Sequence, residues 1–377
     1  DLQGVAFAVF SLPFVLFSGV AGDLSERYSK RRIVVQMKVA EIGIMAAGIL
    51  AFFEMSWTLM LVVLAIMGTQ SAFFGPSKYG VIPEIVPPDR LVPANGMITM
   101  TTFLAVLTGQ ALAGPLMDAF GPAAEAPRLW MPGVVCVGFA VLGTVIALGM
   151  RPLPALRPEL KIGYSPFGDL PATLRTLRKD RRLFDVLLLN SFLWFNSAVL
   201  NQAVNGLGGK DYLAVPADAK VELSYLLTTI SVGIIAGSLA APRLAARFSL
   251  GRVVFLGAGG MAALQIGLLL IGPVVGRDTG GFPVALSLLF AIGFAGALAI
   301  VSVQSWLQDA PPAGMRGQTF AANNFLNFLF MFFAGGFYLL SNLVGPTFTQ
   351  LGGAAILVVY LVRIRRSVAP MAIGGAG

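Results

Sequence analysis

Long apolar segments separated by short polar turns follow one another along the whole chain. We predict eleven membrane-spanning helices, over residues 4–22, 33–53, 57–75, 94–117, 130–150, 185–206, 219–242, 253–273, 282–304, 318–340 and 347–362. Most of these segments approach the roughly 20 residues that an α-helix needs to cross the hydrocarbon core of a bilayer. The pattern therefore predicts an all-α membrane protein.

Composition supports lipid as the solvent. Of the 377 residues, 56% are hydrophobic and only 12% are charged. A soluble domain carries about 25% charged residues, so this chain lacks the charged coat that would cover such a large apolar content in water. No soluble domain interrupts the apolar series.

The basic residues set the orientation of the predicted helices. All but four of the 26 lysines and arginines lie in alternate connections or at the helix ends beside them; the exceptions are Arg128, Lys210, Lys220 and Arg277. Loops rich in Lys and Arg remain in the cytoplasm. We therefore predict a C-terminus in the cytoplasm and an Asp1 end outside. The net charge of +8 then reflects topology and contact with anionic lipid headgroups, and not nucleic-acid binding.

An odd number of spans that begins outside predicts one further helix before Asp1. With that helix the chain would form two six-helix bundles. We expect helices 2–6 within residues 1–150, a basic cytoplasmic linker over residues 151–184, and helices 7–12 with a tail within residues 185–377. Five prolines oppose one continuous helix in the linker, which we expect to carry a short amphipathic helix near residues 169–182.

Several classes of chemistry are excluded or disfavoured. The chain has no histidine, so Ser-His-Asp and Cys-His nucleophile pairs are absent from it. It has no Walker A sequence either, and we expect no catalytic residue, cofactor or metal site. The single cysteine, Cys136, excludes an intrachain disulfide, and we expect a buried, inert thiol.

The first basic turn, residues 22–31, has the sequence GDLSERYSKR. It resembles the Gly-x-Leu-x-Asp-Arg-x-Gly-Arg-Arg signature between the second and third helices of the major facilitator superfamily, with Glu in place of Asp and Ser in place of the second Gly. A glycine at a helix end permits close packing, and charged residues there can hold two bundles together on the inside. We predict a cytoplasmic gate formed by Gly22, Glu26, Arg27, Lys30 and Arg31. The alternative is an ordinary basic turn.

Charged residues also occur within the predicted spans. Lys38 and Glu41 lie three residues apart on one helix face, and Lys78 ends the next helix. A carboxylate inside a membrane costs about 3 kcal/mol, so Glu41 should face the protein interior and a basic partner. These three residues are candidates for substrate binding or gating. A purely structural ion pair near the cytoplasmic surface fits the sequence equally well.

Carboxamides cluster on two predicted helices. Because lipid offers them no partner, they must face a cavity or another helix. We favour cavity lining over interhelical hydrogen bonds and add these residues to the substrate-binding candidates: Asn196, Asn201, Gln202 and Asn205 on one helix, Asn323, Asn324 and Asn327 on the other, and the more isolated Gln110.

Three stretches narrow the resemblance: QSAFFGPSKYGVIPE at 70–84, KVAEI at 38–42 and LQDAPPAGMRGQTFAANNFLN at 307–327. They are similar to the lysophospholipid transporter branch of the superfamily, and to the membrane domain of a larger acyltransferase/acyl-acyl-carrier-protein synthetase fusion. The resemblance implies a secondary transporter that flips lysophospholipids inward across the bacterial inner membrane by alternating access. It also implies functional coupling to an acyltransferase.

Two alternatives remain open. The same fold could transport a drug, a sugar or a metabolite. The chain could also be the membrane domain of a multidomain acyltransferase, which a His-x4-Asp motif in the same reading frame would indicate.

Overall fold

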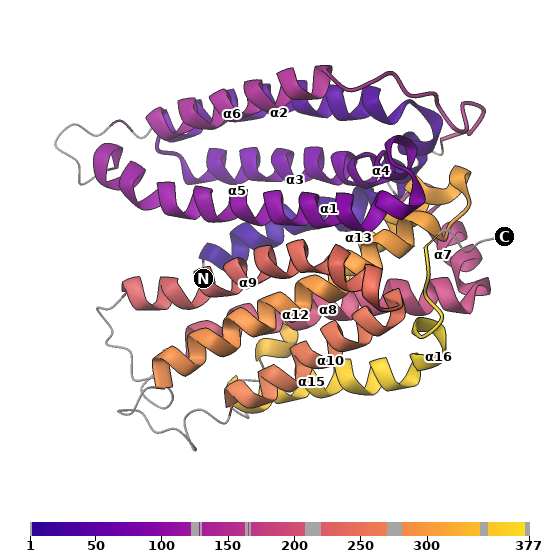
Figure 1. Cartoon of the computed structure of the whole chain (residues 1–377). Helices are drawn as coiled ribbons and strands as arrows, with labels where there is room; N and C mark the ends of the chain where they lie inside the picture. The colour runs from indigo at the N-terminus through magenta and orange to yellow at the C-terminus, as the bar shows by residue number, and fades with distance from the viewer. Residues whose placement is uncertain are drawn as a thin grey trace. The chain divides into compact units, whose positions relative to one another are not determined.

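A computed structural model describes residues 2–121, 128, 130–162, 165, 167–207, 220–269, 281–339 and 346–373 (Figure 1). Every regular element in these ranges is a helix, as predicted. The longer helices are α1 (Leu2–Arg27), α2 (Lys30–Phe53), α3 (Trp57–Gly80), α5 (Leu91–Phe120), α6 (Trp130–Leu148), α7 (Leu170–Lys179), α8 (Arg181–Leu207), α9 (Lys220–Arg247), α10 (Leu250–Leu269), α12 (Gly281–Asp309), α13 (Arg316–Leu339) and α15 (Pro346–Arg363). The short elements are α4 (Ile82–Ile85), η1 (Pro88–Arg90), η2 (Ala313–Met315) and α16 (Arg365–Val368).

The membrane-spanning pattern agrees with the prediction. Within the described ranges, ten helices are long and apolar enough to cross a bilayer, and Thr349–Arg363 forms a shorter apolar helix. Each of the eleven predicted segments overlaps one of them. The helices α1, α3 and α12 continue beyond the apolar runs, to Arg27, Gly80 and Asp309, because each further helical residue pairs one more backbone group within the helix.

Residues 151–162 of the predicted linker form no helix, and the short helix expected within the linker is present as α7; residues 181–184 already belong to α8. The buried residues of α7, Leu170, Thr173 and Leu177, follow the spacing of one helix face. Arg175, Arg178 and Lys179 are exposed on the remaining surface.

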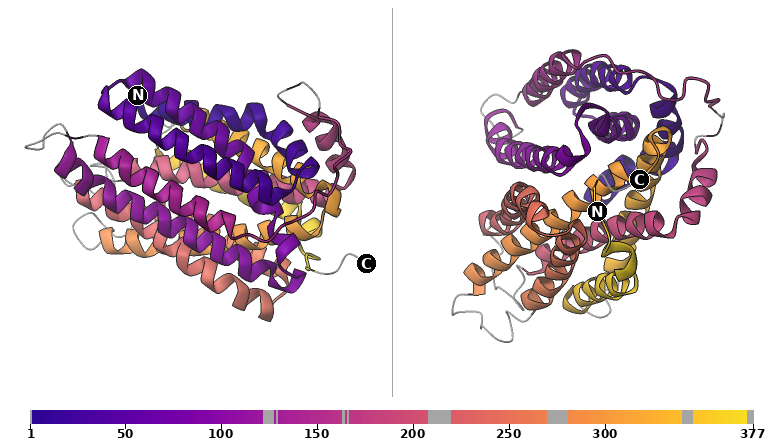
Figure 2. Two further views of the ribbon diagram at one scale, coloured as in Figure 1. Left: turned by 90° about the horizontal axis from the view of Figure 1, so that it is seen from above. Right: turned by 45° about the vertical axis from the view of Figure 1, so that its right-hand side comes forward.

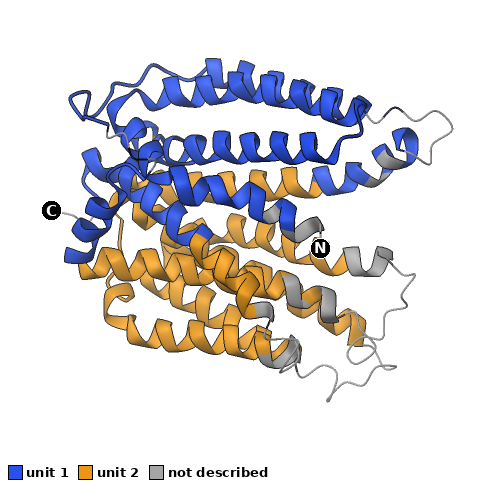
Figure 3. Ribbon diagram, turned by 180° about the vertical axis from the view of Figure 1, so that it is seen from behind, with its two compact units in different colours: residues 1–85, 108–179, 311–328 blue, residues 86–107, 180–310, 329–377 orange. Residues whose placement is uncertain are grey.

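The helices form two compact units, each built from segments of both sequence halves (Figure 3). Unit 1 contains residues 1–85, 108–179 and 311–328, and unit 2 contains residues 86–107, 180–310 and 329–377. The helices α5 and α13 each contribute to both units. The division into helices 2–6, linker and helices 7–12 concerns the order along the chain, and it stays a prediction.

In unit 1, α3 packs against α1 and α2, and α2 packs against α6. The α2–α6 pair lies side by side in Figures 1 and 2. The close contact between α1 and α3 depends on Gly68, because a Cβ atom there would collide with the carbonyl oxygen of Phe10. Small residues allow membrane helices to approach in this way.

In unit 2, α12 packs against α9 and α10, and α15 packs against α8 and α10. Figure 1 shows α9, α10 and α12 as neighbours. The α9–α12 crossing is also made by glycine, since a Cβ atom on Gly293 would collide with the carbonyl oxygen of Ile230.

The expectation of a buried Cys136 is wrong. Cys136 is exposed on α6, among exposed apolar residues such as Val134, Val135 and Phe139. An apolar position in a membrane helix can face lipid as well as protein, so an apolar run alone does not predict burial.

Candidate functional site

A polar cluster forms where α1 ends and α13 begins, within unit 1. One carboxylate oxygen of Glu26 (Oε1) accepts a hydrogen bond from the backbone N–H of Gly317. Gly317 is the second residue of α13, and the N–H groups of a first helical turn have no partner inside their own helix. Glu26 is fully buried. Its carboxylate therefore satisfies a backbone donor at the positive end of the α13 dipole.

Asp23 joins the same helix end to the linker. Its Oδ1 accepts a hydrogen bond of 2.8 Å from Nε2 of Gln318, and its Oδ2 accepts one of 3.0 Å from the N–H of Asp169. Asp169 directly precedes α7. One buried carboxylate thus holds both the start of α13 and the start of α7.

The predicted gate glycine lies in this contact. A Cβ atom on Gly22 would be 2.5 Å from the Cβ of Ala321 and 3.2 Å from the Cα of Gln318. Only glycine permits α1 and α13 to approach closely enough for the hydrogen bonds of Asp23 and Glu26.

Lys30 makes a second, deeper link in the cluster. Its ammonium lies 2.6 Å from Oε1 of Glu84 on α4, and the side chain is almost fully buried. The chain has space for it because a Cβ atom on Gly80 would lie 2.9 Å from Cε of Lys30. The positive charge of Lys30 also acts on Glu26, so one lysine serves two buried carboxylates.

One residue of the linker, Arg157, also makes hydrogen bonds to the cluster. The N–H of Arg157 donates to the carbonyl oxygen of Glu26 over 3.0 Å, and its guanidinium reaches the carbonyl oxygen of Gly314 at 3.4 Å. Gly314 lies in η2, directly before α13.

The two predicted gate arginines lie elsewhere. Arg31 donates to the carbonyl oxygens of Met150 and Leu148, at 2.7 and 3.0 Å, and so caps the end of α6. The guanidinium of Arg27 lies over the ring of Tyr28, 5.5 Å from its centre. Of the five predicted gate residues, the structure places Gly22, Glu26 and Lys30 in the cluster.

Sequence reasoning missed Asp23, Glu84, Arg157 and Gln318. Asp23 lies one residue from the predicted Gly22, and Glu84 and Gln318 lie within the stretches that carried the family resemblance. The position of Asp23 beside a signature glycine could have indicated that it belongs to the cluster. Its partner could not be identified from the sequence, because Asp23 and Gln318 are 295 residues apart.

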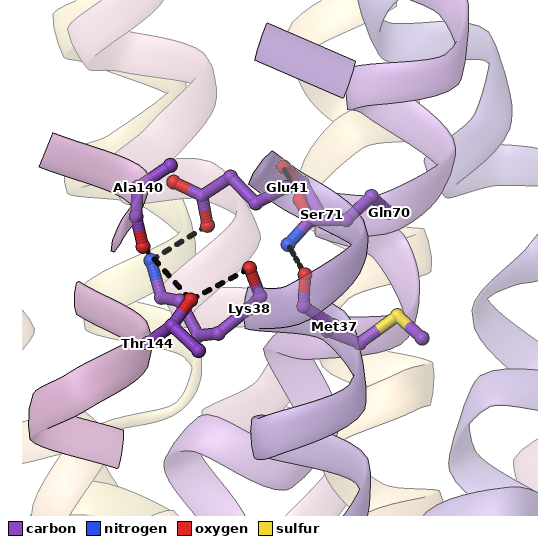
Figure 4. A network of polar contacts seen from close by, with 7 residues as sticks. All are labelled: Met37, Lys38, Glu41, Gln70, Ser71, Ala140 and Thr144. Carbon is purple, nitrogen blue, oxygen red and sulfur yellow. Dashed lines mark hydrogen bonds and ion pairs between the residues drawn. The ribbon is translucent and has the colours of Figure 1, made fainter. Parts of the chain in front are cut away.

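The predicted pair of Lys38 and Glu41 is present in unit 1 (Figure 4). The Lys38 ammonium lies 2.7 Å from Oε2 of Glu41, and about a quarter of each side chain is exposed. The backbone carbonyl of Lys38 accepts a hydrogen bond from Thr144 on α6, at 2.9 Å. On α3, Gln70 donates to the carbonyl of Met37 at 3.0 Å. These bonds fix this part of α2 between α3 and α6.

Lys78 lies close enough to Lys38 for their charges to act on each other. It is half-buried, its ammonium faces the ring of Tyr79 at 5.4 Å, and it pairs with no carboxylate in the part of the chain that the structure describes. Two like charges inside one unit, only one of them neutralised by a carboxylate, give this region a positive potential.

One α13 carboxamide, that of Asn324, comes to the face of α3 that carries Lys78. A Cβ atom on Gly75 would lie 2.6 Å from Nδ2 of Asn324, and Gly75 is three residues, or about one turn, from Lys78. Asn323 and Asn327 are buried on the neighbouring face of α13. Apart from the polar cluster, unit 1 thus contains Lys38 with its partner Glu41, the nearby Lys78, and the Asn324 carboxamide on the Lys78 face of α3.

The remaining carboxamide candidates are more dispersed. Asn196 is fully buried inside unit 2, whereas Asn201 and Gln110 are exposed. The side chains of Gln202 and Asn205 lie outside the described residues.

Sequence reasoning also missed a reciprocal carboxamide pair in unit 2. Nδ2 of Asn95 on α5 donates to Oε1 of Gln308 on α12 at 2.5 Å, and Nε2 of Gln308 donates to Oδ1 of Asn95 at 3.1 Å. Ser305 adds an acceptor for Asn95 at 3.2 Å. Both carboxamides are buried. The pair links α5 and α12 without any charge.

None of the described residues form a group of three or more Cys, Asp and Glu side chains that could hold a metal ion.

A family model described as the Major Facilitator Superfamily matches residues 1–335. The chain belongs to this superfamily. The predicted resemblance to the major facilitator superfamily is thus confirmed, and the predicted all-α membrane fold is confirmed with it.

Curated relatives of this major facilitator protein bear the name lysophospholipid transporter LplT. The LplT of Klebsiella pneumoniae subsp. pneumoniae is 26% identical over 370 residues, which cover 96% of this chain and 86% of the relative. The LplT of Cronobacter sakazakii is 27% identical over 310 residues, covering 81% and 71%. The predicted resemblance to lysophospholipid transporters is therefore confirmed.

Solved structures of major facilitator transporters share the fold. The human organic anion transporter MFSD10 (TETRAN) superposes with a TM-score of 0.77 at 16% identity, covering 96% of this chain and 83% of that one. The E. coli fucose:proton symporter FucP superposes with a TM-score of 0.70 at 17% identity, covering 97% and 90%. The chain is a multi-pass membrane protein of a transporter family.

Proposed function

We propose that this protein is a secondary transporter that moves lysophospholipids inward across the bacterial inner membrane by alternating access. Relatives named for lysophospholipid transport align with almost the whole chain at about a quarter identity. A lysophospholipid carries a phosphodiester headgroup and one acyl tail. A site for it needs positive charge and hydrogen-bond donors beside apolar surface.

Lys78 is the observation that carries this proposal. A lysine inside a membrane span is costly unless a negative group faces it, and the described residues provide Lys78 with an aromatic ring and a second lysine instead. A phosphodiester would supply the missing negative charge. The carboxamide of Asn324, next to Gly75 on the same face of α3, can donate a further hydrogen bond to a phosphate oxygen. Lys38, Glu41, Asn323 and Asn327 complete the proposed headgroup site.

The polar cluster is the proposed cytoplasmic gate. Glu26 and Asp23 hold the start of α13 against the end of α1, and these helices belong to opposite halves of the sequence. When these hydrogen bonds form, the protein is closed on the cytoplasmic side and substrate cannot leave there. When the bonds break, the cytoplasmic side opens. Transporters built from repeated halves generally bind substrate near the bilayer midplane and alternate between two such conformations.

Uptake by spheroplasts tests the proposal. Cells that express the protein should accumulate radiolabelled lysophosphatidylethanolamine faster than cells with an empty vector. Unlabelled lysophospholipids should compete with this uptake, and sugars or small drugs should not. Uptake equal to that of the empty vector would refute the substrate assignment. Competition by small polar solutes alone would favour the alternative of a metabolite transporter.

Lys78→Gln should raise the KM for lysophospholipid by about 10- to 150-fold, which corresponds to about 1.5–3 kcal/mol for a hydrogen bond to a charged group. Lys161→Gln is the matched control, because Lys161 is an exposed lysine of the linker. The measurement is the initial uptake rate against substrate concentration. An unchanged KM in Lys78→Gln would remove this lysine from the headgroup site.

Topology is a second requirement of the proposal. In a background with Cys136→Ser, a cysteine at position 178 should react with a membrane-impermeant maleimide only in inverted vesicles. A cysteine at position 277 should react only in intact spheroplasts. Both positions reacting from the same side would contradict the cytoplasmic placement of the linker and the C-terminus.

A further inference from the structure

Three buried carboxamides in unit 2 have polar atoms without hydrogen-bond partners. Both side-chain polar atoms of Asn196 on α8, Gln265 on α10 and Gln350 on α15 are unpaired among the described residues. Asn196 and Gln265 are fully buried, and Gln350 is 1% exposed. Six unpaired amide atoms would together cost a free energy comparable with the whole stability of a domain. A polar partner that the described residues do not provide would lower this cost.

The three side chains face the interior that their helices enclose. Gln265 shares one face of α10 with the buried residues Ala258 and Met261, seven and four positions earlier. Gln350 shares one face of α15 with Ala354 and Leu357, both buried. Because α15 packs against both α8 and α10, these faces border a common interior.

Asn196 points to the same region from α8. Its Oδ1 would lie 3.9 Å from a Cβ atom on Gly353 of α15, and Gly353 is one turn from Gln350. Because glycine has no side chain, Gly353 leaves room beside the Asn196 amide. The three carboxamides also lie at similar depths along their helices. Each is about 20 Å from one end of its helix: Asn196 from Arg181 of α8, Gln265 from Leu250 of α10, and Gln350 from Arg363 of α15.

We propose that Asn196, Gln265 and Gln350 bind a small cluster of ordered water molecules inside unit 2. Water can donate to the amide oxygens and accept from the amide nitrogens, and buried waters in proteins typically make about three such bonds. A cation is a poorer ligand, because three neutral carboxamides supply no negative charge to offset its desolvation. Divalent cations in particular require carboxylates. This site is separate from the proposed headgroup site, which lies in unit 1.

Met261 provides an internal reporter. It lies one turn from Gln265, its sulfur packs near Gly296 of α12, and it is only 2% exposed. A hydroxyl radical that an X-ray pulse produces from a bound water adds to a neighbouring methionine sulfur, and dissolved oxygen completes the two-electron oxidation to the sulfoxide, which mass spectrometry detects.

The experiment is radiolytic labelling of the purified full chain in sodium-free buffer. Met261 should be oxidised in the unmodified protein. Labelling should fall to background in Gln265→Leu, and it should decrease in Asn196→Leu, which keeps Gln265 but removes a second water ligand. Background labelling of Met261 in the folded, unmodified protein would overturn the proposal and indicate a dry interior in which the amides pair with one another. Loss of labelling on addition of sodium chloride, but not choline chloride, would overturn the choice of water over a cation. The result on the unmodified protein decides the question even where a variant does not fold.

Discussion

Glu26→Ala should increase the reactivity of a cysteine placed at position 25 by about 10- to 150-fold. Ser25 is fully buried in the polar cluster, where its hydroxyl accepts a hydrogen bond from Ser77 at 3.2 Å. A cysteine there, in a Cys136→Ser background, should react with a maleimide only when α1 and α13 separate. Glu26→Ala removes a hydrogen bond to a charged acceptor, which contributes about 1.5–3 kcal/mol. The open population should rise by the corresponding factor.

Transport should fall in the same variant. A protein that rarely closes its cytoplasmic side rarely presents its site to the outside, so the apparent affinity for external substrate decreases with the competent fraction. Glu159→Gln is the control, because Glu159 is an exposed residue of the linker. Glu26→Gln separates the hydrogen bond of the carboxylate from its negative charge. The amide oxygen of Gln can still accept a hydrogen bond from the Gly317 N–H, but it carries no charge. If Glu26→Ala left both the cysteine reactivity and the uptake unchanged, Glu26 would not be part of the gate.

Lys30→Met should produce the second large effect, a loss of about 3–5 kcal/mol in stability. The substitution preserves most of the apolar stem but leaves Glu84, which is 10% exposed, without its ion pair. It also removes the positive charge that acts on Glu26. The two carboxylates, whose charges act on each other, then lose the lysine that they share. The measurement is the thermal unfolding midpoint of the purified protein in detergent.

Two further variants make the Lys30 prediction specific. Lys30→Met combined with Glu84→Gln should recover much of the lost stability, because no unpaired charge remains at position 84. Arg32→Met should change stability by less than about 0.5 kcal/mol, since Arg32 is exposed. If the double variant were no more stable than Lys30→Met alone, the ion pair would not be the source of the effect.

The sequence predicted the helices well because the information for a membrane span is local. An apolar run of sufficient length must form a helix in lipid, whatever its tertiary partners. The turn at residues 22–31 was also recognisable, since its glycine and charged residues are close together in the chain. For the same reason the pair of Lys38 and Glu41, three residues apart, could be expected from the sequence alone.

The partners across the fold could not be predicted in this way. Glu26 bonds Gly317, 291 residues away, and Asn95 bonds Gln308, 213 residues away. No local pattern distinguishes these acceptors and donors from other polar residues at helix ends. Arg31 shows the converse difficulty, because its position in the signature suggested a gate, whereas tertiary packing places it at the last carbonyls of α6.

The direction in which a polar side chain faces was also beyond the sequence. Asn196 and Asn201 lie on one predicted helix, but the first is fully buried inside unit 2 and the second is exposed. An amide in a membrane helix must avoid lipid, and the sequence does not say whether it faces a substrate, a neighbouring helix or bound water.

Exchange of lysophospholipid between the leaflets of liposomes tests the central claim most directly. Purified protein is reconstituted into vesicles that contain unlabelled lysophosphatidylethanolamine in the inner leaflet, and a fluorescent analogue is added to the outer leaflet. Because exchange needs no energy source, its rate should depend only on the protein and the substrate. We expect dithionite to leave a growing, protein-dependent fraction of the fluorescence protected, at a rate that saturates with substrate and decreases in Lys78→Gln. Protection no faster than in protein-free vesicles would contradict the assignment of this chain as a lysophospholipid transporter.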